Sequence, residues 1–291
     1  MKAEVVVDGV RFGEGPVWRP DQCDLVVTSV CDGLLWRVDV DRATKEVLAD
    51  TDGGANGAAL CDDGGLLVTN NGGIDFSTMP AGTVPPGLPT RHATPGLQRV
   101  TPVGSVAYLA GTGLHAPNDL CVAPDGTVFF TDPGHYPPPE PSAGRVLAYR
   151  ADGTVEVIAD GFFYCNGIAL DRGGALVVVE KRGLMRLEPD GGRTWIIRHL
   201  GPGGGDGFCL DADGRFYVAS TVEHGVRVVD PDGTVVDFLE IDGHGTTTNC
   251  CFGGADNRTL FATDAVPGTV VAWEGLPTPG LSMAAWPTPR I

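Results

Sequence analysis

Basic residues are scarce in this chain. Twenty lysines and arginines stand against 37 aspartates and glutamates, which gives a net charge of −17. Binding to a nucleic-acid backbone needs clustered basic side chains, and those present here are scattered, so no nucleic-acid partner is expected. An acidic chain instead raises the concentration of cations near any cleft that carries carboxylates.

Long apolar runs are also missing. No stretch approaches the roughly 18 apolar residues of a membrane helix. Residues 1–16, MKAEVVVDGVRFGEGP, have neither the apolar core nor the cleavage site of a signal peptide. No apolar spacing of i, i+3, i+4, i+7 continues over three turns, so helices are not expected. We therefore expect an all-β cytoplasmic protein without a membrane partner, and the sequence leaves its oligomeric state open.

The C-x-x-C spacing of metal and redox motifs is absent, although the chain has eight cysteines. Most of them lie in apolar runs such as DLCV (119–122) and GFCL (207–210). Reduced, buried cysteines that pack as small hydrophobic residues are therefore expected. If Cys250 and Cys251 lie on one strand, their side chains point to opposite faces of it.

Glycine and proline are abundant, with 43 and 23 residues, and they separate short apolar runs at regular intervals. This distribution indicates many turns rather than disorder. No polar linker or change of composition marks a boundary. We therefore expect one domain over residues 1–291.

Six segments of the chain share one pattern, in which a carboxylate or amide residue precedes a short apolar strand, a turn and a second apolar strand. Their first residues are Glu14, Asn56, Asn118, Asn166, Asp206 and Asn249. The intervals are 40 to 48 residues, apart from one of 62. A period near 40 to 45 residues with short strands is typical of propeller blades. The pattern predicts a six-bladed β-propeller with four-stranded blades.

The two ends of the repeat region carry further information. The last blade is one strand short, and AEVVVDG (3–9) precedes the first repeat. Pairing this stretch with the last blade would close the ring and remove exposed sheet edges.

The longest interval indicates an insertion within 71–117, where proline and glycine predict a functional loop. Whether this loop is a lid stays open.

The six first residues are expected to form a ring, because the innermost strands of a propeller all start at the same end of the channel. Carboxylate and amide oxygens suit a hard divalent cation, and the predicted metal ligands are Glu14, Asn118, Asn166 and Asp206. The ring has no histidine or cysteine, which disfavours a zinc site with nitrogen and sulfur ligands. Asn and Asp also form local turns before strands. For Asn56 and Asn249 that alternative is equally good, and we treat them as substrate-binding candidates.

Five motifs resemble the gluconolactonase, regucalcin and luciferin-regenerating-enzyme family of propellers. They are FGEGPVW (12–18), APNDLCVAPDGTVFFTDP (116–133), NGIALD (166–171), GDGFCLDADGRFYVA (205–219) and TNCCFGGADNRTLFAT (248–263). Diisopropyl fluorophosphatase and the paraoxonases are more distantly similar. The resemblance covers almost the whole chain, and it implies that Glu14, Asn166 and Asp206 match the family's metal ligands. Asn118 matches a residue that binds metal, directly or through water, or contacts substrate.

The resemblance also implies lactone hydrolysis with one divalent cation, Ca²⁺ foremost and Mg²⁺, Mn²⁺ or Zn²⁺ as alternatives. The cation would polarise the lactone carbonyl and stabilise the oxyanion. Asp206 is the favoured catalytic base, and Asp119 is a weaker candidate. A carboxylate on a cation is a poor base, so a hydroxide bound to the cation is the alternative.

The substrate is expected to be a small lactone or ester. Ala116 stands where sugar lactonases of the regucalcin type carry an arginine, so sugar lactones are allowed but not required. The pocket rim would come from residues 71–117 and 134–141. Candidate substrate contacts there, or else solvated loop residues, are His92, His115, His135 and Tyr136.

Other functions fit the sequence less well. There is no G-x-S-x-G motif, and GGGDG (203–207) lacks the lysine and hydroxyl residue of a phosphate-binding loop. A related propeller in a biosynthetic or condensation step is one alternative, and a non-enzymatic scaffold with a structural metal is another. The complete ring of oxygen donors counts against both.

Overall fold

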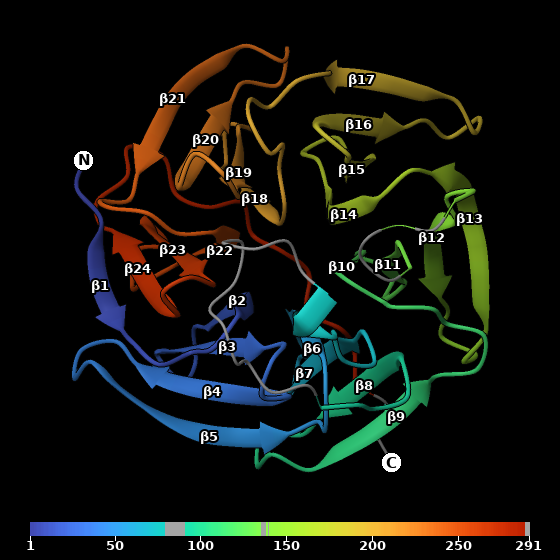
Figure 1. The fold of residues 1–291 in the computed structure, drawn as a ribbon, viewed down its shortest axis with the longest axis horizontal. Helices are drawn as coiled ribbons and strands as arrows, with labels where there is room; N and C mark the ends of the chain where they lie inside the picture. The colour runs from blue at the N-terminus through green and yellow to red at the C-terminus, as the bar shows by residue number, and fades with distance from the viewer. Residues whose placement is uncertain (79–90, 135–137, 139, 289–291) are drawn as a thin grey trace.

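The computed structural model describes residues 1–78, 91–134, 138 and 140–288. Its strands form six antiparallel sheets of four strands each, arranged in a ring around a central channel (Figure 1). The predicted six-bladed propeller is therefore confirmed. The predicted extent of the domain, residues 1–291, stays a prediction. Within the described residues, no helix is long and apolar enough to cross a membrane.

Each blade runs outward from the channel through four strands. The innermost strands are β2 (Gly13–Arg19), β6 (Ala55–Leu60), β10 (Leu120–Val122), β14 (Cys165–Leu170), β18 (Phe208–Leu210) and β22 (Thr247–Gly253). The second strands are β3 (Asp24–Ser29), β7 (Leu66–Asn70), β11 (Val128–Asp132), β15 (Leu176–Glu180), β19 (Phe216–Ser220) and β23 (Thr259–Asp264). The third strands are β4 (Leu34–Asp39), β8 (Gly96–Val100), β12 (Gly144–Tyr149), β16 (Gly183–Leu187), β20 (Gly225–Val229) and β24 (Thr269–Trp273). The outermost strands are β5 (Thr44–Asp50), β9 (Val106–Ala110), β13 (Val155–Phe162), β17 (Arg193–Ile197), β21 (Val235–Glu240) and β1 (Glu4–Val7).

The N-terminal strand closes the ring. β1 pairs antiparallel with β24, with Glu4 opposite Ala272 and Val5 opposite Val271, and it thereby completes the sixth blade (Figure 1). The amide of Val10 then donates to the carbonyl of Gly268 at 2.9 Å. The closure predicted from residues 3–9 is confirmed.

The hydrophobic core lies between the blades rather than inside any one of them. Six clusters of buried side chains each join two neighbouring blades. In one of them, Val26 and Leu35 of the first blade pack with Leu66 and Val68 of the second. The second strands are almost wholly buried because both of their faces meet a neighbouring blade, whereas outer strands such as β13 are largely exposed. This packing holds the innermost strands in fixed positions around the channel.

The insertion in the second blade occupies the first part of the segment 71–117. Strands β8 and β9 lie inside 71–117, so the extra chain is the connection 71–95 between β7 and β8. This connection holds a short 3₁₀ helix, η1 (Phe76–Thr78), and Phe76 packs on Phe12 and Cys31. Because β8 follows Pro95 directly, the proline- and glycine-rich composition concealed where the blade resumes.

The C-terminal segment, residues 276–288, crosses the end of the channel that lies away from the predicted ring. The amide of Leu281 donates to the carbonyl of Leu210 in the fifth blade at 2.8 Å, and the amide of Trp286 donates to Leu60 in the second blade at 2.8 Å. These two blades are opposite each other in a ring of six. Residues 281–286 therefore span the channel.

Candidate metal centre and active site

Hydrogen bonds between blades hold the ring residues at the mouth of the channel. In several blades a threonine of the second strand binds the carbonyl of the ring residue in the next blade. Thr28 donates to Asn56 at 2.5 Å, Thr131 donates to Asn166 at 2.8 Å, and Thr69 donates to Asn118. The backbone of these three ring residues is thus fixed by a neighbouring blade.

A glycine follows the ring residue in most of the repeats, and it allows the innermost strands to meet. The amide of Gly57 donates to the carbonyl of Asn118 at 3.1 Å, and a Cβ atom at Gly57 would lie 2.7 Å from that oxygen. Gly167 makes the same bond to Asp206 at 3.2 Å. No larger residue could stand there without moving the ring. Sequence reasoning missed this feature, although the pairs EG, NG and DG are visible at the ring positions.

Three amide oxygens of the ring have no partner. The Oδ1 atoms of Asn56, Asn118 and Asn166 are buried, and none accepts a hydrogen bond within the part of the chain that the structure describes. A buried polar atom without a partner is costly, and native proteins have few of them. Three such oxygens at equivalent ring positions would be satisfied by a bound cation. Amide oxygens are suitable ligands for a hard divalent cation.

The ring also concentrates negative charge. Burial, together with the charges of Asp206 and Asp119, raises the pKa of Glu14 well above its ordinary value. Burial and the charge of Asp119 likewise raise the pKa of Asp206, and a hydrogen bond from Asn166 opposes that shift. Among the described residues, no ion pair involves Glu14, Asp119 or Asp206. A bound cation would compensate these carboxylates.

Asn249 differs from the other ring asparagines because both ends of its amide are used. Its Nδ2 donates to Glu14 Oε2 at 3.1 Å and to Asp119 Oδ1 at 2.9 Å. Its Oδ1 accepts from the amide of Cys250 at 2.9 Å. Asn249 thus joins the two carboxylates, while burial raises the pKa of Asp119 to about 7. Because its oxygen already accepts one hydrogen bond, Asn249 is a weaker candidate ligand than the other ring asparagines, and a role in substrate binding stays a prediction.

The donor set suits calcium or magnesium better than a softer metal. In the described residues, no three His, Cys, Asp or Glu side chains converge on one point. The predicted set contains only two carboxylates, Glu14 and Asp206, and its other members are the asparagines Asn118 and Asn166. These residues fit a hard cation through the free amide oxygens described above. Asn56 also has a free buried oxygen, so it is an additional candidate ligand.

Two cavities meet the ring from different sides. The outer cavity, of about 500 Å³, is lined by the ring residues Asn56 and Asn118, by residues of the second-blade connection and of the third blade, and by Tyr164 just before β14. The inner cavity, of about 450 Å³, reaches Asp119 and Asn249 and extends toward the C-terminal segment. Both have the size of sites for small molecules. Of these two cavities, the outer one is lined by Asn56 and Asn118, and Asn166 lines neither.

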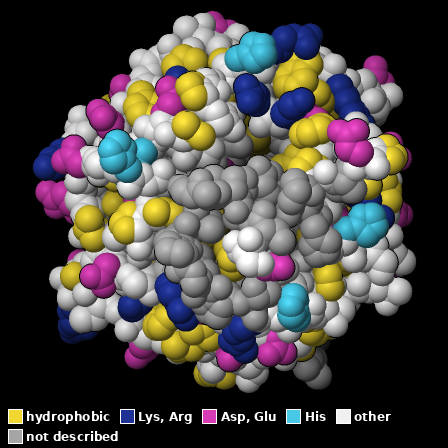
Figure 2. Space-filling view, viewed as in Figure 1, with side chains coloured by type: hydrophobic (Ala, Val, Ile, Leu, Met, Phe, Trp, Pro, Cys, Tyr) yellow, Lys and Arg dark blue, Asp and Glu magenta, His cyan; other side chains and the backbone are white. Residues whose placement is uncertain are grey.

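The predicted pocket contacts have different positions. His92 is exposed and lines the outer cavity. His115 is exposed too, but it is not among the lining residues, and its amide donates to the carboxylate of Asp132 at 3.1 Å. His135 and Tyr136 lie outside the described residues. On this face the histidine side chains are spread apart rather than gathered (Figure 2).

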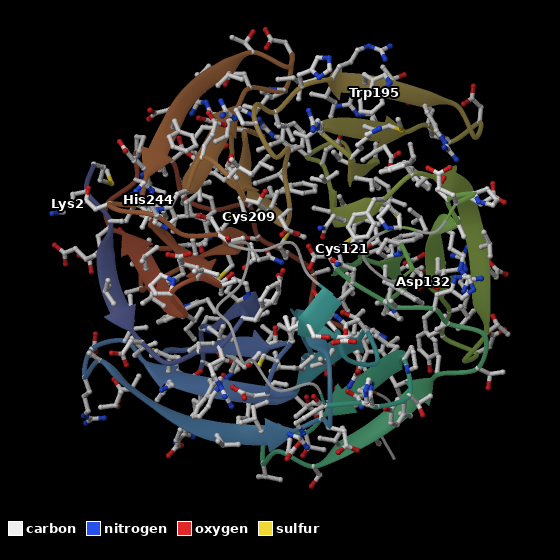
Figure 3. The ribbon with its side chains drawn as sticks, in the orientation of Figure 1. Lys2, Cys121, Asp132, Trp195, Cys209 and His244 are labelled. Atoms are coloured by element: carbon white, nitrogen blue, oxygen red, sulfur yellow. The ribbon has the colours of Figure 1, made fainter. Side chains whose placement is uncertain are left out.

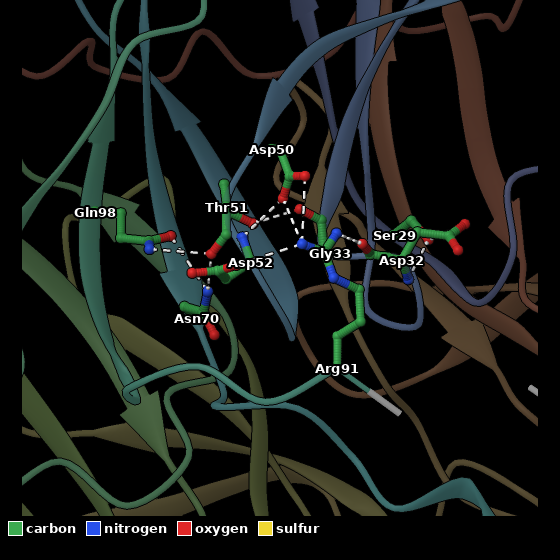
Figure 4. A network of polar contacts seen from close by, with 9 residues as sticks. All are labelled: Ser29, Asp32, Gly33, Asp50, Thr51, Asp52, Asn70, Arg91 and Gln98. Carbon is green, nitrogen blue, oxygen red and sulfur yellow. Dashed lines mark hydrogen bonds and ion pairs between the residues drawn. The ribbon is translucent and has the colours of Figure 1, made fainter. Parts of the chain in front are cut away.

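Sequence reasoning missed several residues of the outer cavity, among them Asn71, Asp75 and Tyr164. A polar network supports the wall that Asn71 belongs to (Figure 4). In it, the side chain of Asn70 donates to the carbonyl of Thr51 at 2.9 Å, and Arg91 donates to Asp50 at 3.0 Å. The run NNGG (70–73) at the end of β7 was the available signal, because amides and glycines favour tight turns.

The fold and the site together define a six-bladed β-propeller with a ring of carboxylate and amide oxygens at one mouth of its channel. Residues 12–266 match a family model described as the SMP-30/Gluconolactonase/LRE-like region, and the chain belongs to this family. The predicted family resemblance is thereby confirmed.

Relatives with curated names include a pentonolactonase of Haloferax volcanii, 25% identical over 90% of this chain and 84% of its own length. A gluconolactonase of Zymomonas mobilis is 22% identical over 89% of this chain and 77% of its own length. A solved gluconolactonase of Xanthomonas campestris has a TM-score of 0.74 at 25% identity, with 94% of this chain and 89% of that chain covered. A regucalcin of Agrobacterium tumefaciens has a TM-score of 0.78 at 20% identity, with 98% and 97% covered, and shows the shared fold.

Proposed function

We propose that this protein is a metal-dependent hydrolase that opens a small lactone, of the sugar type or another. Membership of the family supports the reaction class, as do the names of the pentonolactonase and gluconolactonase relatives. The observation that carries the proposal is the set of buried amide oxygens without partners on Asn56, Asn118 and Asn166. They share the ring with the carboxylates of Glu14 and Asp206, and two of them, Asn56 and Asn118, border a cavity large enough for a sugar lactone.

Glu14, Asn118, Asn166 and Asp206 would hold one divalent cation. Ca²⁺ is the first choice, which is in keeping with the description of the Agrobacterium regucalcin as a calcium-binding protein. Mg²⁺, Mn²⁺ and Zn²⁺ are alternatives. When bound, such an ion supplies Lewis-acid polarisation of a carbonyl.

The protein's own residues would bind the lactone and handle the proton. Asn118 borders the outer cavity and would orient the carbonyl group. Asp206 keeps partial exposure, whereas Glu14 and Asp119 are buried, so Asp206 is best placed to take a proton from attacking water. Water adds to the carbonyl carbon, and the ring C–O bond breaks. The proton passes to the released oxygen, which yields a hydroxy acid.

Asp119 is the weaker candidate for the base. It lines the inner cavity rather than the outer one, and Asn249 binds both of its oxygens, at 2.9 and 3.2 Å. We infer that Asp119 instead orients the ring through Asn249. A cytoplasmic location also stays a prediction.

The test is a lactone panel assayed with the chelator-treated full chain. Pentonolactones, gluconolactone and an unsubstituted lactone would be offered before and after addition of Ca²⁺, Mg²⁺, Mn²⁺ or Zn²⁺. We expect activity on at least one lactone that chelation removes and a metal restores. Asp237→Asn, on the exposed outer strand β21, is the matched control for Asp206→Asn and should leave activity unchanged. Full activity in chelator would contradict metal dependence, and inactivity on every lactone would contradict the reaction class.

A further inference from the structure

The wall of the inner cavity carries four cysteines. They are Cys121, Cys209, Cys250 and Cys251. Cys121 and Cys209 lie toward the middle of the ring (Figure 3). Neither the metal centre nor the proposed reaction uses a thiol. These four cysteines on the innermost strands are therefore available for a separate role.

Two of these thiols face each other across neighbouring blades. Cys209 lies on β18 and Cys250 on β22, and their Sγ atoms are 3.6 Å apart. Two residues before each of these cysteines, the amide of Gly207 donates to the carbonyl of Thr248 at 2.8 Å. Because the two strands run in the same direction from that bond, the cysteines stand opposite each other. Cys250 donates its S–H to the carbonyl of Tyr217 at 3.1 Å, which leaves its sulfur to accept from Cys209.

We propose that Cys209 and Cys250 form a dithiol modification site that a small, neutral peroxide entering the inner cavity converts into a disulfide between the fifth and sixth blades. The sulfurs must approach from 3.6 Å to the roughly 2.05 Å of a disulfide, a change that side-chain rotation and a small shift of the backbone can supply when the backbones are already adjacent. All eight cysteines are free in the structure.

The chemistry balances with hydrogen peroxide as the oxidant. The Cys209 sulfur attacks one peroxide oxygen, the O–O bond breaks, and a sulfenic acid and water form. The Cys250 sulfur then attacks the sulfenic sulfur, the S–S bond forms, and the hydroxyl group leaves as a second water. Two thiols and one peroxide thus give one disulfide and two waters. Cys209 is the better first nucleophile because it is partly exposed, whereas Cys250 is buried.

The surroundings select the oxidant. Apolar side chains such as Trp18, Phe208 and Phe252 line the inner cavity, and the chain carries a net charge of −17. A large anionic disulfide such as oxidised glutathione is therefore disfavoured relative to a peroxide. Burial raises the pKa of the Cys209 thiol well above its ordinary value, so little thiolate is present near neutral pH. Oxidation should consequently be slower than at the exposed Cys23.

The site is connected to the metal centre through Asn249. The amide of Cys250 donates to Asn249 Oδ1 at 2.9 Å, and the same Asn249 side chain holds Glu14 and Asp119. Movement of Cys250 toward Cys209 should therefore displace Asn249 and lower turnover severalfold. This second consequence rests on the proposed lactonase function, whereas disulfide formation does not.

The test uses the full chain carrying Cys23→Ser, which removes the exposed thiol. After exposure to hydrogen peroxide and capping of the remaining thiols, non-reducing peptide mapping should find Cys209 joined to Cys250, and dithiothreitol should reverse the link. Oxidised glutathione at equal oxidising equivalents should give much less of it. Cys209→Ser should abolish the link, while Cys121→Ser, on the same wall, should keep it.

Two outcomes would overturn the proposal. One is full capping of Cys209 and Cys250 after a peroxide exposure far longer than the one that completely oxidises Cys23 in the unsubstituted chain. The other is a link of Cys209 to a different cysteine. Lactonase turnover before oxidation tests the proposed function separately. If the disulfide forms and turnover is unchanged, the coupling through Asn249 is wrong.

Discussion

Asn166 and Asn249 occupy equivalent positions on the innermost strands of the fourth and sixth blades, yet their amide oxygens meet different surroundings. Both side chains bind a carboxylate, since Asn166 hydrogen-bonds Asp206 and Asn249 donates to Glu14 at 3.1 Å and to Asp119 at 2.9 Å. The buried oxygen of Asn166 has no partner in the described chain. The oxygen of Asn249 accepts from the amide of Cys250 at 2.9 Å.

This difference teaches that ring position alone does not make a ligand. A buried amide oxygen that no backbone donor satisfies gains most from a bound cation, whereas one that already accepts a hydrogen bond gains less. Asn166 therefore belongs to the proposed metal set, and Asn249 belongs to the structure that holds the carboxylates together. Substitutions at these two residues and at their partners should separate the two roles.

The largest effect is expected from Asn249→Asp. The change removes the Nδ2 donor between Glu14 and Asp119 and places a third carboxylate against them in a buried site. Uncompensated buried charge costs about 3 to 5 kcal/mol, so the free energy of unfolding should fall by that order in chelator. Denaturant titration measures it. Asn166→Asp is the matched control, and its loss should be smaller and largely recovered with Ca²⁺. Equal losses that Ca²⁺ recovers equally would show that the two residues have the same role.

Asp206→Asn should affect catalysis more than binding. The amide keeps the size of the side chain and one oxygen, but it removes a charge and any basicity. We expect kcat to fall on the order of 10²-fold or more at saturating metal, because a general base is lost. Cation affinity should weaken moderately. Steady-state kinetics over a metal titration gives both values, and recovery of full kcat at high metal would show that Asp206 is not the base.

Asn166→Ala should affect binding more than catalysis. Loss of one ligand should weaken cation affinity by on the order of 10-fold, about 1.4 kcal/mol, while kcat returns at high metal. Glu14→Gln should behave in the same way. The rise of Tm with added Ca²⁺ reports the affinity without any substrate. Asn257→Ala, on the face that the C-terminal segment covers, should leave this Tm shift unchanged. A kcat that stays low at saturating metal would give Asn166 a role beyond coordination.

The sequence was sufficient for the architecture because each blade repeats a local pattern. A polar residue, a short apolar strand and a turn recur in order, and the unpaired apolar stretch at residues 3–9 indicated the closing strand. It was insufficient for the connection 71–95, where Pro95 stands directly beside β8 and composition carries no boundary. Composition reports how readily a segment turns, whereas strand pairing depends on the neighbouring chain.

The ring was predictable as a set of residue types, but the roles within it were not. The contact of Asn249 with Asp119 joins residues 130 positions apart, and nothing local distinguishes that asparagine from Asn166. The same limit applies to the thiols, because Cys209 and Cys250 are 41 positions apart in two different blades. Cys250 and Cys251 do enter different core clusters, as expected for neighbours on a strand.

The smallest expected effect concerns the threonines behind the two asparagines. Thr131 donates to the carbonyl of Asn166 at 2.8 Å, and Thr131→Val would remove that bond with little change of shape. Thr131 also accepts from the amide of Asp119 at 3.2 Å, so two hydrogen bonds are lost and the free energy of unfolding should fall by about 1 to 2 kcal/mol. Because the carbonyl held by Thr131 belongs to a proposed ligand, Ca²⁺ affinity should also weaken slightly.

Thr263→Val is the counterpart for Asn249. Thr263 accepts from the amide of Asn249 at 3.0 Å and shares a hydrogen bond of 2.9 Å with Thr248, so this change should cost about as much stability as Thr131→Val. It should leave Ca²⁺ affinity nearer to that of the unchanged chain, because Asn249 is not a ligand. Denaturant titration and Ca²⁺-dependent Tm shifts on the two variants give the comparison. A larger loss of Ca²⁺ affinity in Thr263→Val would place Asn249 in the metal set and remove the distinction between the two asparagines.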